Sequence, residues 1–100
     1  MSTIGLKDIL GDFAEDKDIA RKIRIESIIP ELENGEKIIL DFSGINLVTQ
    51  SFIHALISDL IRRYGIDIVH DISFKECNKT IRTIINVVID YMQDIVADEE

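Results

Sequence analysis

The sequence predicts a single α/β domain, in which a small mixed β-sheet is packed against about three helices. An unbroken apolar run, Ile38–Leu40, precedes Asp41 and is typical of a central strand that is covered on both faces. Two later segments, 51–64 and 78–96, repeat apolar residues at helical spacing. The 100 residues fit one domain, and a hydrophobic content of 46% is enough for a core.

The acidic composition argues against two classes of partner. The formal net charge is −8 and the sequence pI is about 4.6, whereas a nucleic-acid surface needs clustered Lys and Arg. An anionic membrane surface is disfavoured for the same reason, and no apolar segment is long enough to span a bilayer. We therefore expect neither nucleic acid nor membrane as a partner. A basic partner, or one met through apolar contacts, fits better.

The cysteine and histidine residues limit the expected cellular compartment and the expected metal chemistry. Cys77 is the single cysteine, so no intramolecular disulfide can form and a reducing compartment is expected. The N-terminus has no charged region followed by an apolar run, so we expect no signal peptide and a cytoplasmic location. His54, His70 and Cys77 lack zinc-ligand spacing, and a glycine-rich phosphate loop is missing. We therefore expect no metal and no cofactor.

The first third of the chain is predicted to form an edge strand and a helix. Ile4 and Leu6 alternate with small or polar neighbours, which indicates a short edge strand near the N-terminus. A helix is expected from about Glu15 or Asp16, where acidic side chains complement the helix dipole. Pro30 should kink or break that helix, because proline lacks a donor and clashes with the preceding turn.

The middle of the chain predicts a second helix and further strand. The helix runs from Ser51 to Tyr64, with Gly65 as its stop. Its apolar arc is wider than a surface helix needs, which favours burial between the sheet and another helix and leaves open a face for a partner. Segment 66–74 alternates, so it should form one strand or two short ones interrupted near His70-Asp71.

The last helix is predicted to begin after Asn78, a good N-cap. Its apolar stripe consists of Ile81, Ile84, Ile85, Val88, Met92, Ile95 and Val96. Residues 97–100 place negative charge where it opposes the helix dipole, so this tail should fray. The two-sided apolar pattern of 19–32 and the wide arc of 51–64 leave surplus apolar surface, which predicts a homodimer.

The loop between the apolar strand and the helix at Ser51 is the predicted functional site, because its exposed backbone is held by rigid flanks. Ser51 is expected to be the helix N-cap, or to accept a phosphate that the free N–H groups of the first turn would hold. Ser43 and Thr49 are weaker phosphoacceptor candidates in the same loop. Asp41 is expected to hydrogen-bond loop N–H groups.

A serine hydrolase is a weaker interpretation of the same residues. It would need Ser51, Asp41 and a histidine within reach of one another. His54 lies only three residues along the helix, and His70 lies on another element. Because no nucleophile-elbow pattern surrounds the serine, we expect no enzymatic activity.

The stretch Leu40-Asp-Phe-Ser-Gly-Ile, followed by Val48-Thr-Gln-Ser-Phe and a helix, resembles the STAS-like domain family of uncharacterised function. The segments Gly35-Glu-Lys and Ile72-Ser-Phe-Lys-Glu-Cys-Asn are similar to that family as well, so the resemblance covers most of the chain. The chain is more distantly similar to true STAS domains, the anti-sigma-factor antagonists. These carry Asp-Ser-Ser-Gly at the start of a helix, and a serine there is phosphorylated by an ATPase-type kinase partner.

Against that motif, Thr49, Gln50 and Ser51 occupy the Asp-Ser-Ser positions, and Phe52 replaces the glycine. The resemblance therefore implies Ser51 as the phosphoacceptor. The expected partner-binding residues are Ser43, Thr49, Gln50, Ser51, Phe52 and Ile53.

The resemblance also implies a regulatory or adaptor domain. Family members are often encoded beside, or fused to, histidine-kinase-type ATPase domains, so such an ATPase is the expected partner protein. A small-molecule or nucleotide-binding module that uses the same helix N-terminus is the alternative.

Overall fold

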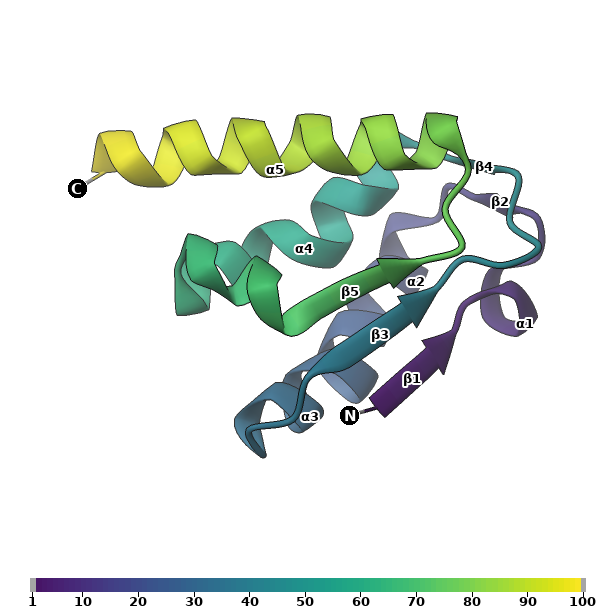
Figure 1. Cartoon of the computed structure of the whole chain (residues 1–100), viewed down its shortest axis with the longest axis horizontal. Coiled ribbons are helices and arrows are strands. Elements are labelled where there is room, and N and C mark those ends of the chain that lie inside the picture. Colours follow the sequence, from purple (N-terminus) through teal and green to yellow (C-terminus); the bar gives the residue numbers. More distant parts are fainter. Residues whose placement is uncertain (1, 100) are drawn as a thin grey trace.

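The computed structural model describes residues 2–99, with side chains for residues 2–95, and has its helices gathered on one face of a small sheet (Figure 1). The main sheet has the order β1-β3-β5 and consists of β1 (Ser2–Gly5), β3 (Ile38–Asp41) and β5 (Ile72–Lys75). A separate two-stranded ribbon consists of β2 (Phe13–Ala14) and β4 (Leu47–Val48). The α/β class is confirmed. The sheet is not mixed, because every strand pair among the described residues is parallel.

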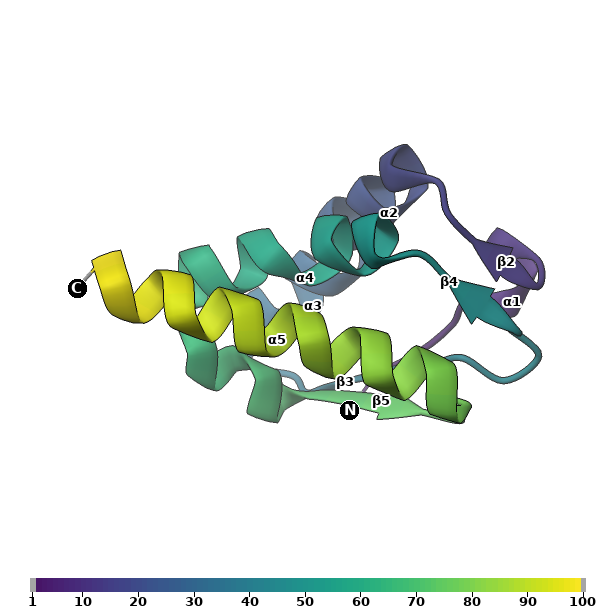
Figure 2. The same ribbon diagram turned by 90° about the horizontal axis from the view of Figure 1, so that it is seen from above.

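Three long helical segments cover the sheet. The helical elements are α1 (Lys7–Leu10), α2 (Lys17–Ile23), the π-helical turn η1 (Arg24–Ile28), α3 (Ile29–Glu33), α4 (Gln50–Tyr64), the 3-10 segment η2 (Ile66–Asp71) and α5 (Lys79–Glu99). Both views place α2, α4 and α5 on the same side of the main sheet (Figures 1 and 2). These three match the predicted helices, whereas the single turn of α1 is too short to show helical periodicity.

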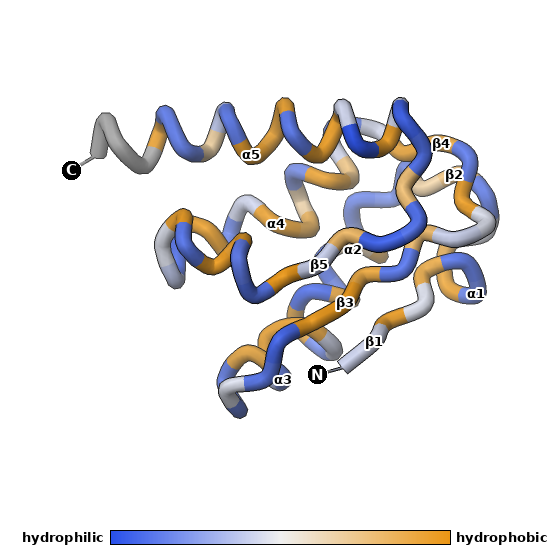
Figure 3. The backbone as a smooth tube through the Cα atoms, viewed as in Figure 1, coloured by the Kyte–Doolittle hydropathy of each residue, from blue (hydrophilic) through white to orange (hydrophobic). Residues whose placement is uncertain are grey.

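β3 is the central strand, as predicted, but only one of its faces is covered. Ile38 and Leu40 are completely buried beneath the helices. Ile39 points to the other face and is half-buried, and its neighbours across the sheet, Thr3 and Ser73, are exposed. The expectation of cover on both faces is therefore wrong. The run is apolar throughout (Figure 3). Ile38 and Leu40 face the core, and Ile39 is partly shielded by neighbouring side chains on the open face of this central strand.

α4 lies at the centre of the core. Its side chains that are no more than 1% exposed are Phe52, Ile53, Leu56, Ile57, Leu60 and Ile61. They join the inward residues of the sheet and of α2 and α5 in one hydrophobic cluster. The wide apolar arc is therefore used by internal packing, as the burial interpretation predicted. The homodimer, which was argued partly from this arc, stays a prediction.

The segment that contains Pro30 departs from α geometry just before the proline. Because the ring clashes with the carbonyl four residues earlier, the turn Arg24–Ile28 widens to a π-helix. The chain stays helical across Pro30, and the expected irregularity takes the form of this π-helical turn. Arg24 within it is buried, donates to the Ala55 carbonyl at 2.5 Å and pairs with Asp59 at 3.1 Å. This side chain ties the widened turn to α4.

Segment 66–71 is a 3-10 helix and not a strand, so only Ile72–Lys75 extends. Gly65 ends α4 with a φ of 89°, and the chain must then return to the sheet within a few residues. Ile66 and Ile68 pack against the core from this turn. Their burial produces the alternating pattern without an extended backbone.

The predicted starts of α2 and α5 and the predicted edge strand agree with the structure. β1 lies at an edge of the sheet. Asp16 caps α2, with its carboxylate accepting from two N–H groups of the first turn. Asn78 caps α5, accepting from the N–H of Ile81 at 2.9 Å. The predicted fraying of 97–100 lies outside the residues whose side chains are described.

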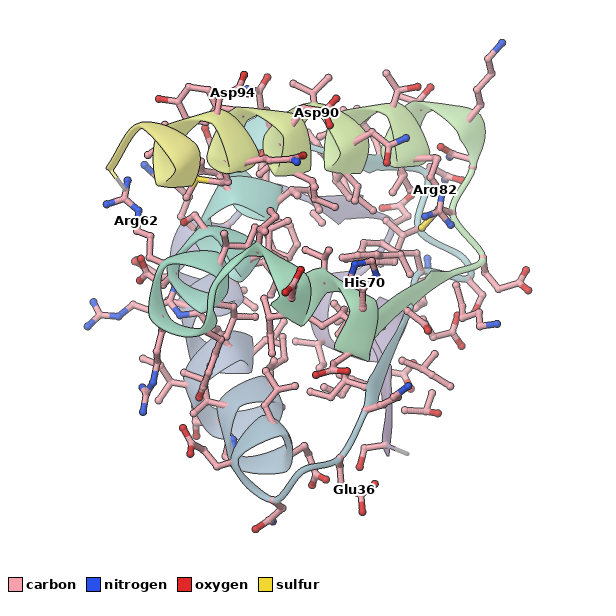
Figure 4. The ribbon with its side chains drawn as sticks, turned by 60° about the vertical axis from the view of Figure 1, so that its left-hand side comes forward. Glu36, Arg62, His70, Arg82, Asp90 and Asp94 are labelled. Atoms are coloured by element: carbon pink, nitrogen blue, oxygen red, sulfur yellow. The ribbon has the colours of Figure 1, made fainter. Side chains whose placement is uncertain are left out.

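The second edge of the sheet, β5, faces a hollow of about 530 Å³ between this strand, η2 and α5. Arg82, on the first turn of α5, reaches into this region (Figure 4). Its Nη2 donates to the Phe74 carbonyl at 2.7 Å. One backbone acceptor of the edge strand is therefore occupied by a side chain.

The one-sided sheet makes a prediction about two adjacent residues. Leu40→Asp should unfold the protein, because an unpaired buried carboxylate costs several kcal/mol against a typical total of roughly 5–15 kcal/mol. Ile39→Asp makes the same change on the open face and should leave a cooperative thermal transition. Circular dichroism melts of both variants would check this. Equal damage from both would show that the outer face is covered.

Candidate functional site

Two parallel strand–helix units meet at the candidate site. β2 leads into α2, β4 leads into α4, and the two strands pair in parallel. Their carboxyl ends therefore lie side by side, and the first turns of α2 and α4 follow next to each other (Figure 2). In α/β folds, ligands often bind just outside the carboxyl ends of parallel strands.

The first turns of α2 and α4 line a shallow depression of about 430 Å³. The lining residues are Lys17, Gln50, Ser51, His54 and Ala55. Lys17 is the first residue of α2, and the other four lie on the first two turns of α4. His54 is half-buried, and its ring centroid lies 6.2 Å from that of Tyr91 on α5. The depression therefore joins α2 and α4, and α5 supports one side of it.

Thr49, and not Ser51, is the N-cap of α4. The backbone at Thr49 is extended, and its Oγ1 accepts from the N–H of Phe52 at 3.0 Å. Thr49 also donates its own N–H to the Ala14 carbonyl at 2.9 Å, which holds the helix start against β2. The expectation that Ser51 caps the helix is therefore wrong. The helix begins at Gln50, one residue earlier than predicted.

Ser51 is exposed and occupies the second position of α4. Thr49 accepts from the N–H groups of Phe52 and Ile53, the latter through its carbonyl at 3.2 Å. The N–H groups of Gln50 and Ser51 are the remaining first-turn donors, which have no carbonyl one turn earlier in the helix. No acidic side chain lies in this turn, so the positive end of the helix dipole is not offset there. The hydroxyl of Ser51 is thus accessible at a position that favours negative charge.

Phe52 and Ile53 lie in the core and not on a partner surface. Both side chains are completely buried in the hydrophobic cluster, so a partner cannot touch them in the folded protein. Ser43 is exposed, but it lies in the turn between β3 and β4 and outside the lining of the depression. Of the predicted partner-binding residues, Gln50 and Ser51 are the two that the depression brings together.

Asp41 organises the turn that follows β3. Its carboxylate accepts from the N–H of Ser43 at 2.9 Å, as predicted. Hydrogen bonding from the backbone and the side chain of Ser43 lowers the pKa of Asp41 from its ordinary value of 3.8. Gly44 then takes a φ of 83°, and a Cβ there would lie 3.1 Å from the side chain of Lys7. The positive φ favours glycine at this position, and a larger residue would also require the exposed Lys7 side chain to move.

The residues of the hydrolase interpretation are not linked as a triad. Asp41 accepts from Ser43, and among the described side chains no hydrogen bond joins Ser51 to His54 or His70. Within the same part of the chain, no three potential metal ligands come together. No helix in residues 2–99 is long and apolar enough to cross a membrane.

A family model described as a STAS-like domain of unknown function matches residues 19–82, which is more than half of the chain. The chain belongs to this family. No curated protein and no solved structure matches it. In this STAS-like domain the matched region begins within α2 and ends on the first turn of α5, so it includes all of α4 with Ser51.

Sequence reasoning missed the position of Lys17 at the depression of this STAS-like domain. Lys17 stands in the acidic run 15–18, where it looks like a solvated first-turn residue. The pairing of β2 with β4 and the packing of α2 on α4 bring it to the same depression as Ser51. Both strands have two residues, which is too short for a periodic signal.

The cap assignment can be tested by two substitutions in neighbouring positions. Thr49→Ala should lower the free energy of unfolding by about 0.5–2 kcal/mol, because the N–H of Phe52 loses its acceptor. Ser51→Ala should change it by less than about 0.5 kcal/mol, because the side chain is exposed and caps nothing. Urea denaturation would measure both, with Thr49→Ser as the variant that keeps the hydroxyl. A larger loss in Ser51→Ala would restore that serine as the cap.

The turn after β3 should respond to acid. The folded-state pKa of Asp41 lies below 3.8, so the stabilisation by its hydrogen bonds is present above that pH and is lost as pH falls through the lowered value. An NMR titration should show the Asp41 carboxyl and the Ser43 amide sharing one midpoint below 3.8. Asp41→Asn keeps an acceptor oxygen but should abolish the titration. A midpoint at the ordinary value would contradict the assignment.

Proposed function

We propose that this STAS-like domain is a non-enzymatic regulatory or adaptor domain that binds a partner protein, a histidine-kinase-type ATPase, through the start of α4. Phosphorylation of Ser51 switches that binding. One observation supports the proposal above the others. An accessible serine hydroxyl stands on the second position of a helix whose positive end carries no acid, with Lys17 in the same depression.

The surroundings of Ser51 would accept a phosphate without damage to the fold. A phosphate adds roughly −1.5 to −2 charges at neutral pH. The N–H groups of Gln50 and Ser51 and the ammonium of Lys17 are the groups that could neutralise it. The next two residues, Phe52 and Ile53, hold the helix in the core and point away from the site. Modification would therefore alter the surface and leave the packing intact.

A phosphate on Ser51 would also occupy the depression. It would cover the free N–H groups of the first turn and engage Lys17, so a partner that uses those groups would lose them. A partner surface shaped for an uncharged hydroxyl would additionally have to desolvate the phosphate. Both effects oppose binding. Lys17 and the first-turn N–H groups would neutralise much of the phosphate charge, so its attraction for a basic partner would be small and the loss of contacts would decide the direction.

The switch is tested with the partner that wild-type protein retains from native lysate, purified and identified by mass spectrometry. Ser51→Glu should bind it about tenfold or more weakly, whereas Ser51→Ala should bind and lose regulation. Incubation of wild-type protein with that partner and ATP should place a phosphate on Ser51.

Ser73→Glu is the matched control, because Ser73 is an exposed serine on the open sheet face and away from any helix start. This variant should bind like wild type. All variants are compared at a temperature where thermal melts show them folded. The switch is refuted if Ser51→Glu binds as tightly as wild type and no phosphate appears on Ser51.

A small-molecule or nucleotide-binding module is the second candidate. The depression has a volume in the range of ligand pockets and offers a lysine and a histidine, Lys17 and His54. Thermal scans with ATP, ADP and inorganic phosphate discriminate between the two candidates. A rise in melting temperature with one of these, lost in Lys17→Met, would favour the ligand-binding function.

A further inference from the structure

The β2–β4 ribbon carries an apolar pair that is open to solvent. Phe13 and Leu47 lie directly opposite each other across the ribbon and are 44% and 42% exposed. The next residue on each strand, Ala14 and Val48, faces the core and is buried. A strand pair with one face in the core normally presents polar side chains on the other. Phe13 and Leu47 depart from this pattern, because both are large and apolar and stand side by side on the solvent face.

The apolar pair lies next to the candidate site. Leu47 precedes Ser51 by four residues, and Phe13 precedes Lys17 by four. Since an extended chain advances at most about 3.6 Å per residue, each Cα of the apolar pair lies within about 14 Å of its counterpart at the depression. The apolar pair and the depression are therefore close enough for one partner to contact both.

The charge around the apolar pair selects the kind of partner. The exposed acidic residues that flank Phe13 along the chain are Asp12, Glu15, Asp16 and Asp18. Lys17 is the one cation in that segment. A second copy of this chain would bring a further net charge of −8 and the same acidic rim, which opposes close approach. A segment rich in lysine or arginine complements this rim.

The spacing of the apolar pair suits a helix. Neighbouring strands lie about 4.8 Å apart, and residues at positions i and i+4 of a helix lie about 5–6 Å apart. One apolar stripe of a helix can therefore straddle both side chains of the pair. We propose that Phe13 and Leu47 are the apolar anchor of the partner-binding surface, and that the partner docks a basic amphipathic helix on them. This inference rests on the proposed function and names the chemistry of the partner segment.

The probes are synthetic peptides of about 18 residues, or five helical turns. One peptide is a Leu/Lys amphipathic helix, the second has the same composition scrambled so that no apolar stripe forms, and the third replaces Lys by Glu. Fluorescence anisotropy with the full chain at physiological salt should show the amphipathic Lys peptide binding about tenfold or more tightly than the scrambled one. The Glu peptide should not bind.

Substitutions then locate the binding site. Phe13→Ser and Leu47→Ser should each weaken binding of the amphipathic Lys peptide about tenfold or more, whereas Phe13→Leu should retain it. Ile25→Ser is the matched control, because Ile25 on η1 is 47% exposed and lies outside the ribbon. It should bind like wild type. Thermal melts of each variant would check that the exposed substitutions leave the fold intact.

Three outcomes would overturn the inference. Equal affinity for the scrambled peptide would show attraction by net charge alone. Equal loss in Ile25→Ser would show that binding is not at the ribbon. A wild-type dimer in sedimentation equilibrium that becomes a monomer in Phe13→Ser would show that a second copy covers the apolar pair.

Binding measurements with the native partner distinguish this inference from the proposed function. If Phe13→Ser weakens binding of the captured partner and Ser51→Glu does not, the anchor stands and the phosphorylation switch fails. If Ser51→Glu weakens binding and Phe13→Ser does not, the proposed function stands and the anchor fails.

Discussion

The burial of α4 between the inward face of β3 and the helices α2 and α5 holds the rest of the structure in place. Because the other face of the main sheet is open, all the side chains that exclude water lie in one layer between sheet and helices. Each large aliphatic or aromatic side chain that is removed from water contributes about 1.5–3 kcal/mol, and α4 supplies six of the most deeply buried ones. The start of this helix is consequently fixed by the core behind it and by the Thr49 bond to Ala14.

At the start of α4, the residues that stabilise the core and the residue that is open to solvent are neighbours in the sequence. Successive helical residues point about 100° apart, so Ser51 can face solvent while Phe52 and Ile53 face the core. A change of charge at the hydroxyl leaves the buried contacts untouched. The fixed helix start also means that a ligand or partner at the depression would require little rearrangement of the backbone.

Local signals account for the parts of the fold that the sequence predicts well. The apolar run of β3, the stripe of α5 and the stops or caps at Gly65 and Asn78 are each encoded within a few neighbouring residues. The cap of α4 was misassigned because threonine and serine are both good N-caps. The choice between Thr49 and Ser51 is made by a long-range bond to Ala14, which composition does not reveal. η2 was missed because a 3-10 turn against the core imitates strand alternation.

The candidate site was harder to predict than the fold for the same reason. Its helix start follows from periodicity, but Lys17 and the apolar pair reach it only through a ribbon of two-residue strands. A pairing that short leaves no pattern in the sequence. The open face of β3 is a further long-range property, because the apolar run at 38–40 is the same whether one face or both are covered.

The hydrogen bond from Arg82 to the Phe74 carbonyl has a consequence for the solubility of the protein. A parallel sheet with an unpaired edge is a template on which a strand of another molecule can add, and repeated addition leads to fibrous aggregates. The guanidinium occupies an acceptor that such a strand would need, and it places a positive charge beside the edge. α5 therefore does more than cover the core: its first turn also makes the β5 edge a poorer template for strand addition.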